Sequence, residues 1–442
     1  MNLKDIKQIG EGAFAKVFLV EDDDGTQYAK KLFAPHSAIE RAIGIDDLRK
    51  RFKREVMYQD TIDHPNVVNI VEYNLEEDIP FFIMPLAECT LKDELGKDST
   101  LGGNPKKALF DILAGLEVMH NNGFTHRDLK PANILKFVEN GNIRYAISDF
   151  GLITSNHSES STLTGTGAGG GTENYAAPEL NGGFKRANFA ADIYSFGAIL
   201  HDIYGNKVVR IPYTELNSIP DEMGRIVSKC TKKLPIRRYK SVTELREDLY
   251  NVLDTQIIKF NSTSEENIIK ILKSKSELSD DEWDELFIYV DECIHGNVSC
   301  ANIYASITAE HINFLVDSPE LFNALGSNFC LYILEGKGTF DFDYCDVLAA
   351  KAELFYNGDD IGLKAEVSIA VLILGTSHNR WYVEQKYMKM VNKNISDELA
   401  NRIKIELEVQ EIDFRRQISH LEGSIHASKN DLHPILQAYL EE

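Results

Sequence analysis

The sequence lacks any long apolar run. Its longest, from Val367 to Leu374 and interrupted by Ser368, is far too short to cross a bilayer. Residues 1–10 contain no apolar segment of the kind found in secretion signals. The six cysteines are scattered without a CxxC pair, which favours free thiols in a reducing compartment and argues against a zinc site. We therefore expect a cytoplasmic protein with no membrane segment.

Positive charge is also scarce, chiefly in the second half of the chain. The formal net charge is -22; residues 1–250 hold 36 acidic and 31 basic side chains, whereas residues 251–442 hold 33 and 16. Because nucleic acids and anionic membranes are bound through Lys and Arg, we exclude both as main partners. A length of 442 residues predicts two or three domains, and the change in charge near residue 250 marks a candidate boundary.

What the sequence does contain is a short stretch, His126–Asn133, that brings an acid, a cation and an amide together. Asp128, Lys130 and Asn133 supply these groups, and a second acid, Asp149, follows sixteen residues after Asn133. Carboxylate and amide oxygens suit Mg²⁺, and a lysine suits a phosphate group. The stretch therefore predicts a site that holds metal-bound phosphates beside a hydroxyl.

The chain before this stretch has the pattern of a sheet that approaches a phosphate. Gly10 and Gly12 lie between two strand-like runs, where a hairpin backbone can come close to a ligand. In the predicted strand 26–33, alternation places Lys31 on the same face as Ala29 and beside that hairpin. We expect this lysine to contact phosphate.

A predicted helix, 49–62, follows and carries Glu55 among several cations. This carboxylate either pairs with the phosphate lysine or is an ordinary solvated side chain. Strands are predicted at 67–73 and 80–84. The connector that comes next, Pro85–Cys89, offers backbone groups to which an adenine edge can bond.

The rest of the first half alternates between apolar helices and one polar loop. Helices are predicted at 108–120, 192–200 and 242–252, and a hairpin of two strands at 134–138 and 143–148. The loop 152–171 is rich in Ser, Thr and Gly, so we expect it to be mobile.

Taken together, these motifs resemble those of the eukaryotic-type (Hanks-type) Ser/Thr protein kinases. At least seven motifs occur in that family's order within about the first 250 residues. The resemblance implies a bilobal α+β protein kinase domain over 1–254, with an N-lobe over about 1–86 and a C-lobe over about 87–254. It also implies ATP and Mg²⁺ as cofactors and proteins as substrates, with Ser or Thr as the acceptor because Lys130 is typical of that branch.

The family's functional residues transfer position by position. Nucleotide contacts fall on Gly10, Gly12, Ala13, Phe14, Val17, Ala29, Lys31, Met84, Pro85 and Ala87. The resemblance assigns catalytic roles to Lys31, Glu55, Asp128, Lys130 and Thr172. It assigns the binding of Mg²⁺ to Asn133 and Asp149. Structural roles fall on Asp192, which would brace the catalytic loop, and on Glu179 and Arg238, which would form a buried ion pair.

Gln59 departs from the family pattern more than any other position we note. Relatives usually carry Leu or Met there, in an apolar stack with Phe150 and His126. A glutamine should weaken that stack, so that the active placement of Glu55 would need a phosphorylated loop or a partner. The alternative is that Gln59 turns to solvent at little cost.

Arg127 is the predicted regulatory residue, because in relatives this arginine binds a phosphate on the mobile loop. Thr162, Thr164 and Thr166 lie nearest the middle of that loop and are the best acceptors for autophosphorylation. The alternative is that these hydroxyls are ordinary loop composition.

Residues 255–442 resemble no family that we can name, and their pattern is helical. Gly and Pro breaks are too few for a β domain, so we expect an all-α domain. Capping boxes are predicted at Ser262-x-x-Glu265 and Ser279-x-x-Glu282, and one long helix over 397–418. Three aromatic side chains are expected in its core: Trp283, Trp381 and Tyr382.

The expected function is phosphoryl transfer from ATP to protein hydroxyls. One alternative is a pseudokinase scaffold whose helical half carries the function; intact Lys31, Asp128, Asn133 and Asp149 argue against it. A small-molecule kinase is a third option, which the segment ending at Glu179 disfavours because it resembles a peptide-docking loop. For residues 255–442 we weigh a regulatory or substrate-recruiting protein partner, homodimerisation and a purely supporting role.

Overall fold

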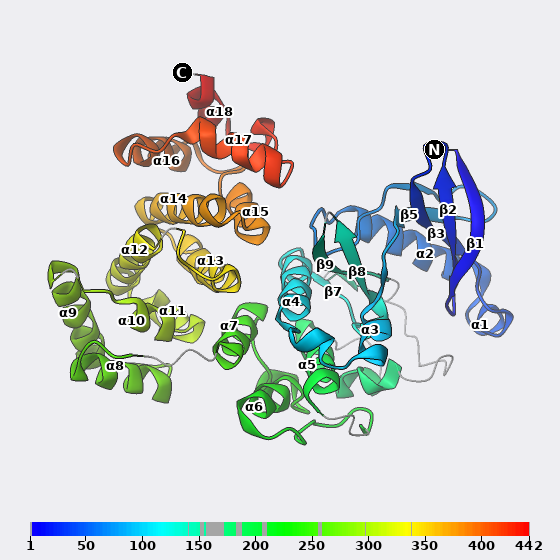
Figure 1. Ribbon diagram of the computed structural model, residues 1–442, viewed down its shortest axis with the longest axis horizontal. Coiled ribbons are helices and arrows are strands. Elements are labelled where there is room, and N and C mark those ends of the chain that lie inside the picture. Colours follow the sequence, from blue (N-terminus) through cyan, green and yellow to red (C-terminus); the bar gives the residue numbers. More distant parts are fainter. Residues whose placement is uncertain are drawn as a thin grey trace. The chain divides into compact units, whose positions relative to one another are not determined.

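The computed structural model describes residues 2–139, 141–150, 154–155, 172–182, 188–205, 210–254, 259–296, 298–336 and 338–441. The chain forms two compact units, Met1–Leu245 and Arg246–Glu442 (Figure 1). The first unit combines strands and helices, whereas the described part of the second contains helices but no β-strand. This agrees with the predicted α+β region followed by an all-α region.

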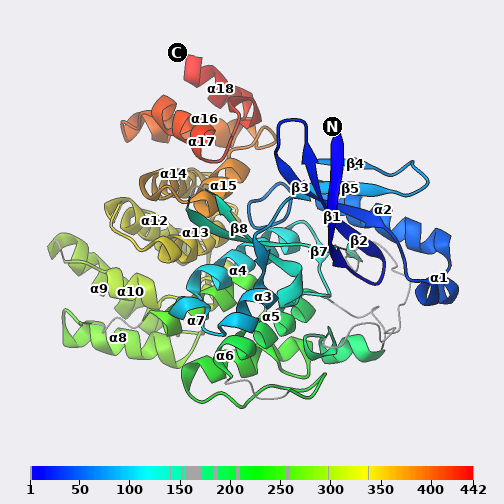
Figure 2. The ribbon, with the colours of Figure 1, turned by 45° about the vertical axis from the view of Figure 1, so that its right-hand side comes forward.

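An antiparallel sheet opens the first unit (Figure 2). Its strands lie in the order β1-β2-β3-β5-β4. Their bounds are β1 Leu3–Glu11, β2 Ala15–Asp22, β3 Gln27–Phe33, β4 Glu72–Asn74 and β5 Phe81–Pro85. The two helices between β3 and β4 are α1 Ser37–Ile43 and α2 Ile45–Asp60.

Helix α2 is held on the sheet by one apolar face. Leu48, Phe52 and Val56 recur at one-turn spacing and are buried. The Phe52 ring lies 5.6 Å from the ring of Phe33 and 5.7 Å from that of Phe82, so it packs between β3 and β5. The helix predicted at 49–62 is therefore confirmed, with a start four residues earlier.

The rest of the first unit is mostly helical. Its elements are β6 Cys89–Thr90, α3 Leu91–Lys97, α4 Lys106–Asn121, β7 Phe124–Thr125, β8 Ile134–Glu139, β9 Asn142–Ile147, β10 Thr154–Ser155, α5 Phe189–Tyr204, α6 Asp221–Cys230 and α7 Val242–Leu253. β8 and β9 pair antiparallel, with Ile134 opposite Ile147, which confirms the predicted hairpin. α7 begins in the first unit and continues into the second.

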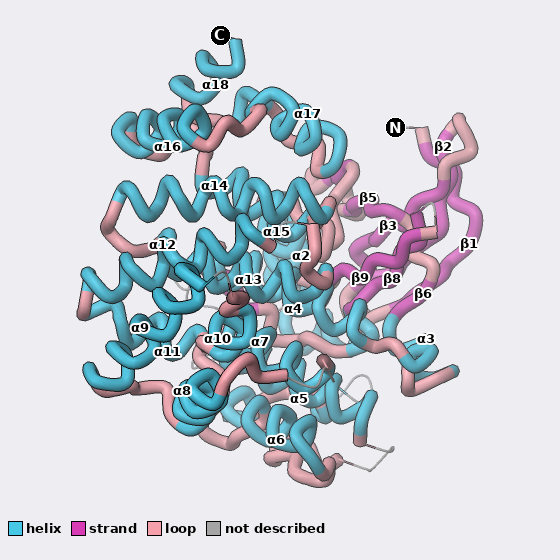
Figure 3. Tube along the Cα trace, turned by 60° about the vertical axis from the view of Figure 1, so that its left-hand side comes forward, coloured by secondary structure: helices cyan, strands magenta, loops and turns pink. Residues whose placement is uncertain are grey.

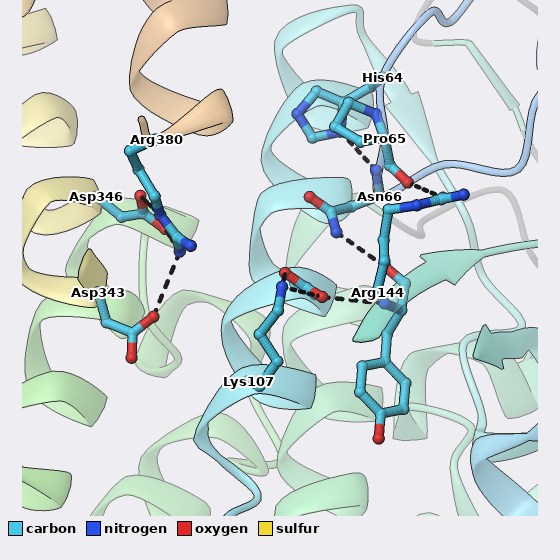
Figure 4. Close-up of polar contacts among 10 residues, drawn as sticks. His64, Pro65, Asn66, Lys107, Arg144, Asp343, Asp346 and Arg380 are labelled. Carbon is cyan, nitrogen blue, oxygen red and sulfur yellow. Dashed lines mark hydrogen bonds and ion pairs between the residues drawn. The ribbon is translucent and has the colours of Figure 1, made fainter. Parts of the chain in front are cut away.

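The predicted strand 67–73 is wrong over most of its length. The segment around Val68 instead lies beside β9: the Val68 amide donates to the Ile147 carbonyl, and the Ile147 amide donates to the Asn66 carbonyl, both at 2.9 Å. Side chains reinforce this contact, because Asn66 Nδ2 donates to the carbonyl of Tyr145 and Arg144 donates to the carbonyl of Pro65 (Figure 4). These bonds use the backbone groups that a regular sheet strand would need.

The second unit is an array of helices. Their bounds are α8 Thr263–Ser274, α9 Asp280–Gly296, α10 Ala301–Ser306, α11 Ala309–Phe314, α12 Pro319–Glu335, α13 Phe342–Tyr356, α14 Ile361–His378, α15 Trp381–Met390, α16 Asp397–Val409, α17 Phe414–Ser424 and α18 Pro434–Glu441. α14 is central within this unit and packs against α12, α13, α15 and α16 (Figure 3).

The apolar run of α14 is explained by this central position. Val367, Ile369, Ala370 and Val371 are fully buried, so the middle of the helix is covered on most of its sides. By length and composition α14 is the one helix among the described residues that could span a membrane. This is weak evidence for a membrane span, because 61% of that segment is buried and core helices of soluble proteins can have the same length and composition.

Two expectations for the second unit are wrong. The helix predicted over 397–418 divides into α16 and α17, because Glu411 takes a left-handed conformation (φ 53°) and Asp413 begins a new helix by accepting from the Arg416 amide at 3.0 Å. Trp381 is 40% exposed and is no core residue, whereas Trp283 and Tyr382 are buried as predicted.

Each of the two predicted capping boxes forms only in part. Ser262 Oγ accepts from the Glu265 amide at 3.0 Å, but the Glu265 carboxylate accepts from Asn261 rather than from Ser262. At Ser279, the backbone amide donates to the Glu282 carboxylate at 2.8 Å. Both sites begin a helix, as predicted.

Candidate active site

Lys31 lies between two carboxylates that come from distant parts of the first unit. Its ammonium ion-pairs with Glu55 of α2 and also donates to Asp149 Oδ1 at 3.1 Å. The Glu55 side chain is buried, whereas that of Asp149 is 43% exposed. The structure therefore brings together three of the predicted residues and leaves one carboxylate open to a ligand.

The charges in this cluster shift one another's ionisation. Burial by itself would raise the pKa of Asp149, but Lys31, with help from Lys130 and His126, lowers that pKa to about 2. Burial would lower the pKa of Lys31, but Asp149 and Glu55 raise it above its ordinary value. Asp149 is thus a carboxylate, and Lys31 an ammonium, at any physiological pH.

The backbone at the start of the His126–Asn133 stretch is held by the buried carboxylate of Asp192. Its oxygens accept from the His126 amide at 2.9 Å and from the Arg127 amide at 2.8 Å. His120 Nε2 donates to the same carboxylate at 2.9 Å. Arg127 has a positive φ of 68°, so these bonds stabilise a conformation that L-residues rarely adopt. Burial would raise the pKa of Asp192, but His120, His126 and the Arg127 amide lower it.

Asp128, Lys130 and Asn133 converge in the next turn of the chain. Lys130 Nζ lies 2.7 Å from Asp128 Oδ2, and Asn133 Nδ2 donates to the Asp128 carbonyl at 2.9 Å and to Oδ2 at 3.2 Å. Burial raises the pKa of Asp128, an effect that Lys130 opposes and Asp149 reinforces. Asp128 is thereby a stronger base than an exposed aspartate.

His126 connects this loop with the segment that carries Asp149. Its Nε2 donates to the Ser148 carbonyl at 3.0 Å, and its Nδ1 accepts from the Asp128 amide at 3.3 Å. The Ser148 amide in turn donates to the Asn133 carbonyl at 2.8 Å. Asp149 has a φ of 65°, a second positive value within the site. The loop and the end of β9 are therefore one hydrogen-bonded assembly.

The predicted nucleotide contacts lie around one apolar cluster on the sheet. Gly10 is opposite Val17 in the β1–β2 hairpin, and the Gly12 amide donates to the Ala15 carbonyl at 2.8 Å. Met84 of β5 is opposite Ala29 of β3. Four predicted residues are partly buried against the cluster that contains Ala29 and Met84: Ala13, Phe14, Val17 and Ala87. Pro85 ends β5, opposite Tyr28.

Glu179 and Arg238 form a buried two-pronged ion pair. Both nitrogen–oxygen distances are 2.7 Å, and the Arg238 side chain is fully buried. Arg238 also donates to the carbonyls of Ala190 and Lys232 at 2.7 and 2.8 Å. The pair therefore ties the segment before α5 to the turn after α6.

Part of the predicted site lies outside the described residues. These positions are Thr162, Thr164 and Thr166, together with the side chain of Thr172. Arg127, whose backbone is held by Asp192, is described and half-buried.

Sequence reasoning missed several residues that support the site. His120 stacks on Phe189 at 4.4 Å while it bonds Asp192. Tyr175 donates to Asp202 at 2.6 Å and so anchors the segment that begins at Thr172. These partners are far apart in sequence, and only the family pattern could have suggested them. Leu135 packs against the apolar cluster that contains Ala29 and Met84. In the sequence it is only one apolar residue of a predicted strand.

Residues 3–280 match the family model of the protein kinase domain, so the chain belongs to the protein kinase family. This confirms the predicted resemblance and identifies the first unit as a bilobal protein-kinase fold, with a sheet-bearing N-lobe and a helical C-lobe. The predicted boundary at residue 254 stays a prediction, since the family match ends at residue 280 and the first compact unit at Leu245.

The relatives that the chain resembles are serine/threonine-protein kinases. It is 29% identical over 303 residues to PrkC of Bacillus subtilis, which covers 60% of this chain and 43% of PrkC. It is 28% identical over 232 residues to PknB of Mycolicibacterium smegmatis (47% and 36% covered) and 30% identical over 250 residues to CBL-interacting kinase 21 of Arabidopsis thaliana (52% and 57% covered). The chain thus spans less than two thirds of each relative.

Proposed function

We propose that this protein is an ATP- and Mg²⁺-dependent Ser/Thr protein kinase. It would transfer the γ-phosphate of ATP to hydroxyl groups of proteins. One observation carries the proposal: the Lys31 ammonium is held by Glu55 and by a half-open Asp149, while the Asp128 loop is hydrogen-bonded to the same segment.

The residues present fit Mg²⁺. Asp149 is ionised and partly exposed, and Asn133, whose Nδ2 is used by Asp128, retains its side-chain oxygen as a ligand atom. Among the described residues there is no group of three or more His, Cys, Asp or Glu placed to hold a metal. Mg²⁺ is usually held by one or two protein ligands, and phosphate oxygens and water complete its coordination shell. The ion would neutralise phosphate charge during transfer.

Lys31 would bind and orient the phosphates of ATP. Glu55 is buried behind it and fixes the position of the ammonium, so that the cation needs little reorganisation when phosphate arrives. The tight Gly10–Gly12 hairpin lets backbone amides approach the same phosphates, and the apolar cluster around Ala29 would take the adenine.

Asp128 would accept the proton of the substrate hydroxyl as the oxygen attacks. Its raised pKa suits it as a base, and Lys130, 2.7 Å away, would supply positive charge beside the transferred phosphoryl group. The family resemblance assigns Thr172 a role on the substrate side of this pair.

Regulation by the loop 152–171 belongs to the proposal. Arg127 would bind a phosphate on Thr162, Thr164 or Thr166 after autophosphorylation. Mass spectrometry of protein incubated with ATP should find phosphate on at least one of these threonines, and none in the Asp128→Asn variant. Modification confined to other residues would contradict this part.

The helical unit has no assigned chemistry. We propose that residues 255–442 bind a regulatory protein or a second copy of the chain, and that the protein works in the cytoplasm. Light scattering of the purified protein over a range of concentrations tests self-association directly.

The decisive experiment measures phosphate transfer from labelled ATP with Mg²⁺ to a generic basic protein. Asp128→Asn should lower the rate by about 10²–10⁴-fold, the usual contribution of a general base, with an unchanged melting temperature. A wild-type protein that binds ATP but transfers no phosphate would support a pseudokinase scaffold instead.

A further inference from the structure

Gln59 is buried in an unusual way for a polar side chain. It lies on α2 one helical turn after Glu55, and it is 1% exposed. Its Nε2 donates to the Val68 carbonyl at 2.6 Å. The expectation that this side chain turns to solvent is therefore wrong.

The Val68 carbonyl connects α2 with the catalytic segment. The amide of the same residue donates to the Ile147 carbonyl at 2.9 Å, and Ile147 ends β9 two residues before Asp149. Gln59 thus contacts a peptide segment that is also hydrogen-bonded to β9. Through this segment, the helix that carries Glu55 is linked to the strand end that carries Asp149.

Stability by itself does not explain a glutamine at this position. Its Oε1 is buried without a hydrogen-bond partner, and an unsatisfied buried acceptor is costly. A leucine of similar size would avoid that cost. The feature that a leucine could not reproduce is the donor to Val68.

We propose that Gln59 is a positioning residue for phosphoryl transfer, whose amide fixes the distance between α2 and the Asp149 segment. The two carboxylates on Lys31 come from these two elements, so the Gln59–Val68 bond sets how both reach the ammonium. The inference rests on the proposed function and adds to it a residue that touches neither substrate nor cofactor.

The structure also weakens the opposite expectation, that Gln59 loosens the active arrangement. The rings of His126 and Phe150 remain in edge contact at 5.7 Å, and Phe150 is buried. The Lys31–Glu55 ion pair is formed in the same structure. A second contact, between the rings of Tyr58 and Phe124 at 5.1 Å, also holds the last turn of α2. The fold should therefore survive loss of the Gln59 amide.

The test compares Gln59→Leu and Gln59→Met with the wild-type protein in the full chain. Both variants keep the size of the side chain and remove the donor, so one serves if the other fails to fold. We expect kcat/KM for protein phosphorylation to fall by about 10–100-fold, the scale of a small misplacement of catalytic groups, with an equal or higher melting temperature. Met57→Leu, an exposed neighbour on α2, is the matched control and should retain wild-type activity.

A second readout does not depend on turnover. Lys31 should be acylated faster by acetic anhydride in the Gln59 variants, because its contacts with Glu55 and Asp149 restrict access to the amine in the wild type. Peptide mass spectrometry measures this rate against that of exposed Lys50 in the same sample. A purely structural role for Gln59 would leave the ratio unchanged.

Unchanged or increased activity in Gln59→Leu would overturn the inference, and an increase would favour the loosened stack. Failure of the proposed function looks different, since the wild-type protein itself would then transfer no phosphate. In that case the Lys31 acylation ratio still decides whether Gln59 positions the two carboxylates.

Discussion

Charged side chains that are paired in the two units differ in whether a ligand could reach them. In the first, Lys31, Glu55 and Asp149 meet where one carboxylate remains 43% exposed. In the second, Glu247 and Lys351 form an ion pair at 2.7 Å with side chains 4% and 1% exposed. The first arrangement leaves charge available to a ligand, whereas the second uses its charge inside the fold. Burial and pairing alone therefore do not mark a functional site; partial exposure of a fixed charge is the more informative sign.

Other polar groups of the second unit follow the same rule. Glu384 is fully buried and accepts from His420 at 2.8 Å and from Ser424 at 2.6 Å. Arg380 pairs with Asp346 at 2.7 Å and with Asp343 at 3.3 Å (Figure 4). These contacts join α13, α15 and α17 within the unit, and we expect them to act on stability.

The largest effect should come from breaking the buried ion pair between Glu247 and Lys351. Lys351→Met leaves the Glu247 carboxylate without its ion-pair partner, although it still accepts from the Ala309 amide at 2.9 Å, and should lower the free energy of unfolding by about 3–5 kcal/mol. Burial already raises the pKa of Glu247 and Lys351 opposes this, so the loss should grow as pH rises and the carboxyl ionises. Urea unfolding measured at several pH values gives both quantities.

Two variants control this experiment. Lys393→Met replaces an exposed lysine of the same unit and should be nearly neutral. The double variant Glu247→Gln/Lys351→Met removes the stranded carboxyl and should recover part of the loss. A single variant with wild-type stability would break the comparison between the units.

Asp149→Asn tests the open arrangement in the first unit. Removing the charge that orients Lys31 and would bind Mg²⁺ should lower kcat by about 10²–10³-fold. Only a modest fall in melting temperature is expected, because the partly solvated side chain contributes less to stability than a buried ion pair does. Asp24→Asn, in an exposed turn of the same unit, is the matched control for both measurements. A large loss of stability with normal kcat would reverse the roles assigned here.

A smaller effect is expected at the start of α14. Asp360 Oδ1 accepts from the Leu363 amide at 2.7 Å and so caps this central helix. Asp360→Ala should cost about 1 kcal/mol of unfolding free energy, whereas neighbouring Asp359→Ala should cost less. Thermal melts of the two variants measure the difference, and equal melting temperatures would rule out a cap.

The smallest expected effect is a displacement of the pH profile. Because the pKa of Asp128 is raised, kcat/KM should begin to fall at a higher pH than it would with an ordinary aspartate as the base. Lys130 lowers that pKa, so Lys130→Met should move the acid limb to higher pH in addition to reducing the rate. A limb that keeps its position would show that Lys130 does not act on Asp128.

Much of the first unit could be read from its sequence because local patterns carry the information. The hairpin at Gly10–Gly12, the helix around Glu55 and the 134–148 hairpin depend on alternation and turn residues close in the chain. The segment around Val68 was misread as a sheet strand, since its hydrogen bonds go to β9, some eighty residues away. The break between α16 and α17 was missed because Asp413 offers only one weak capping signal inside a helical pattern.

The sequence by itself determined the chemistry of this protein: which side chains carry charge, which turns they follow and which family they resemble. Tertiary structure alone decided what each of these groups does in place. It put Asp149 on Lys31, left that carboxylate partly open, closed Glu247 against Lys351 and turned Gln59 from an expected weakness into a buried contact. The reason is physical: the ionisation and the bonding of a polar group depend on its burial and on partners that folding brings from distant parts of the chain.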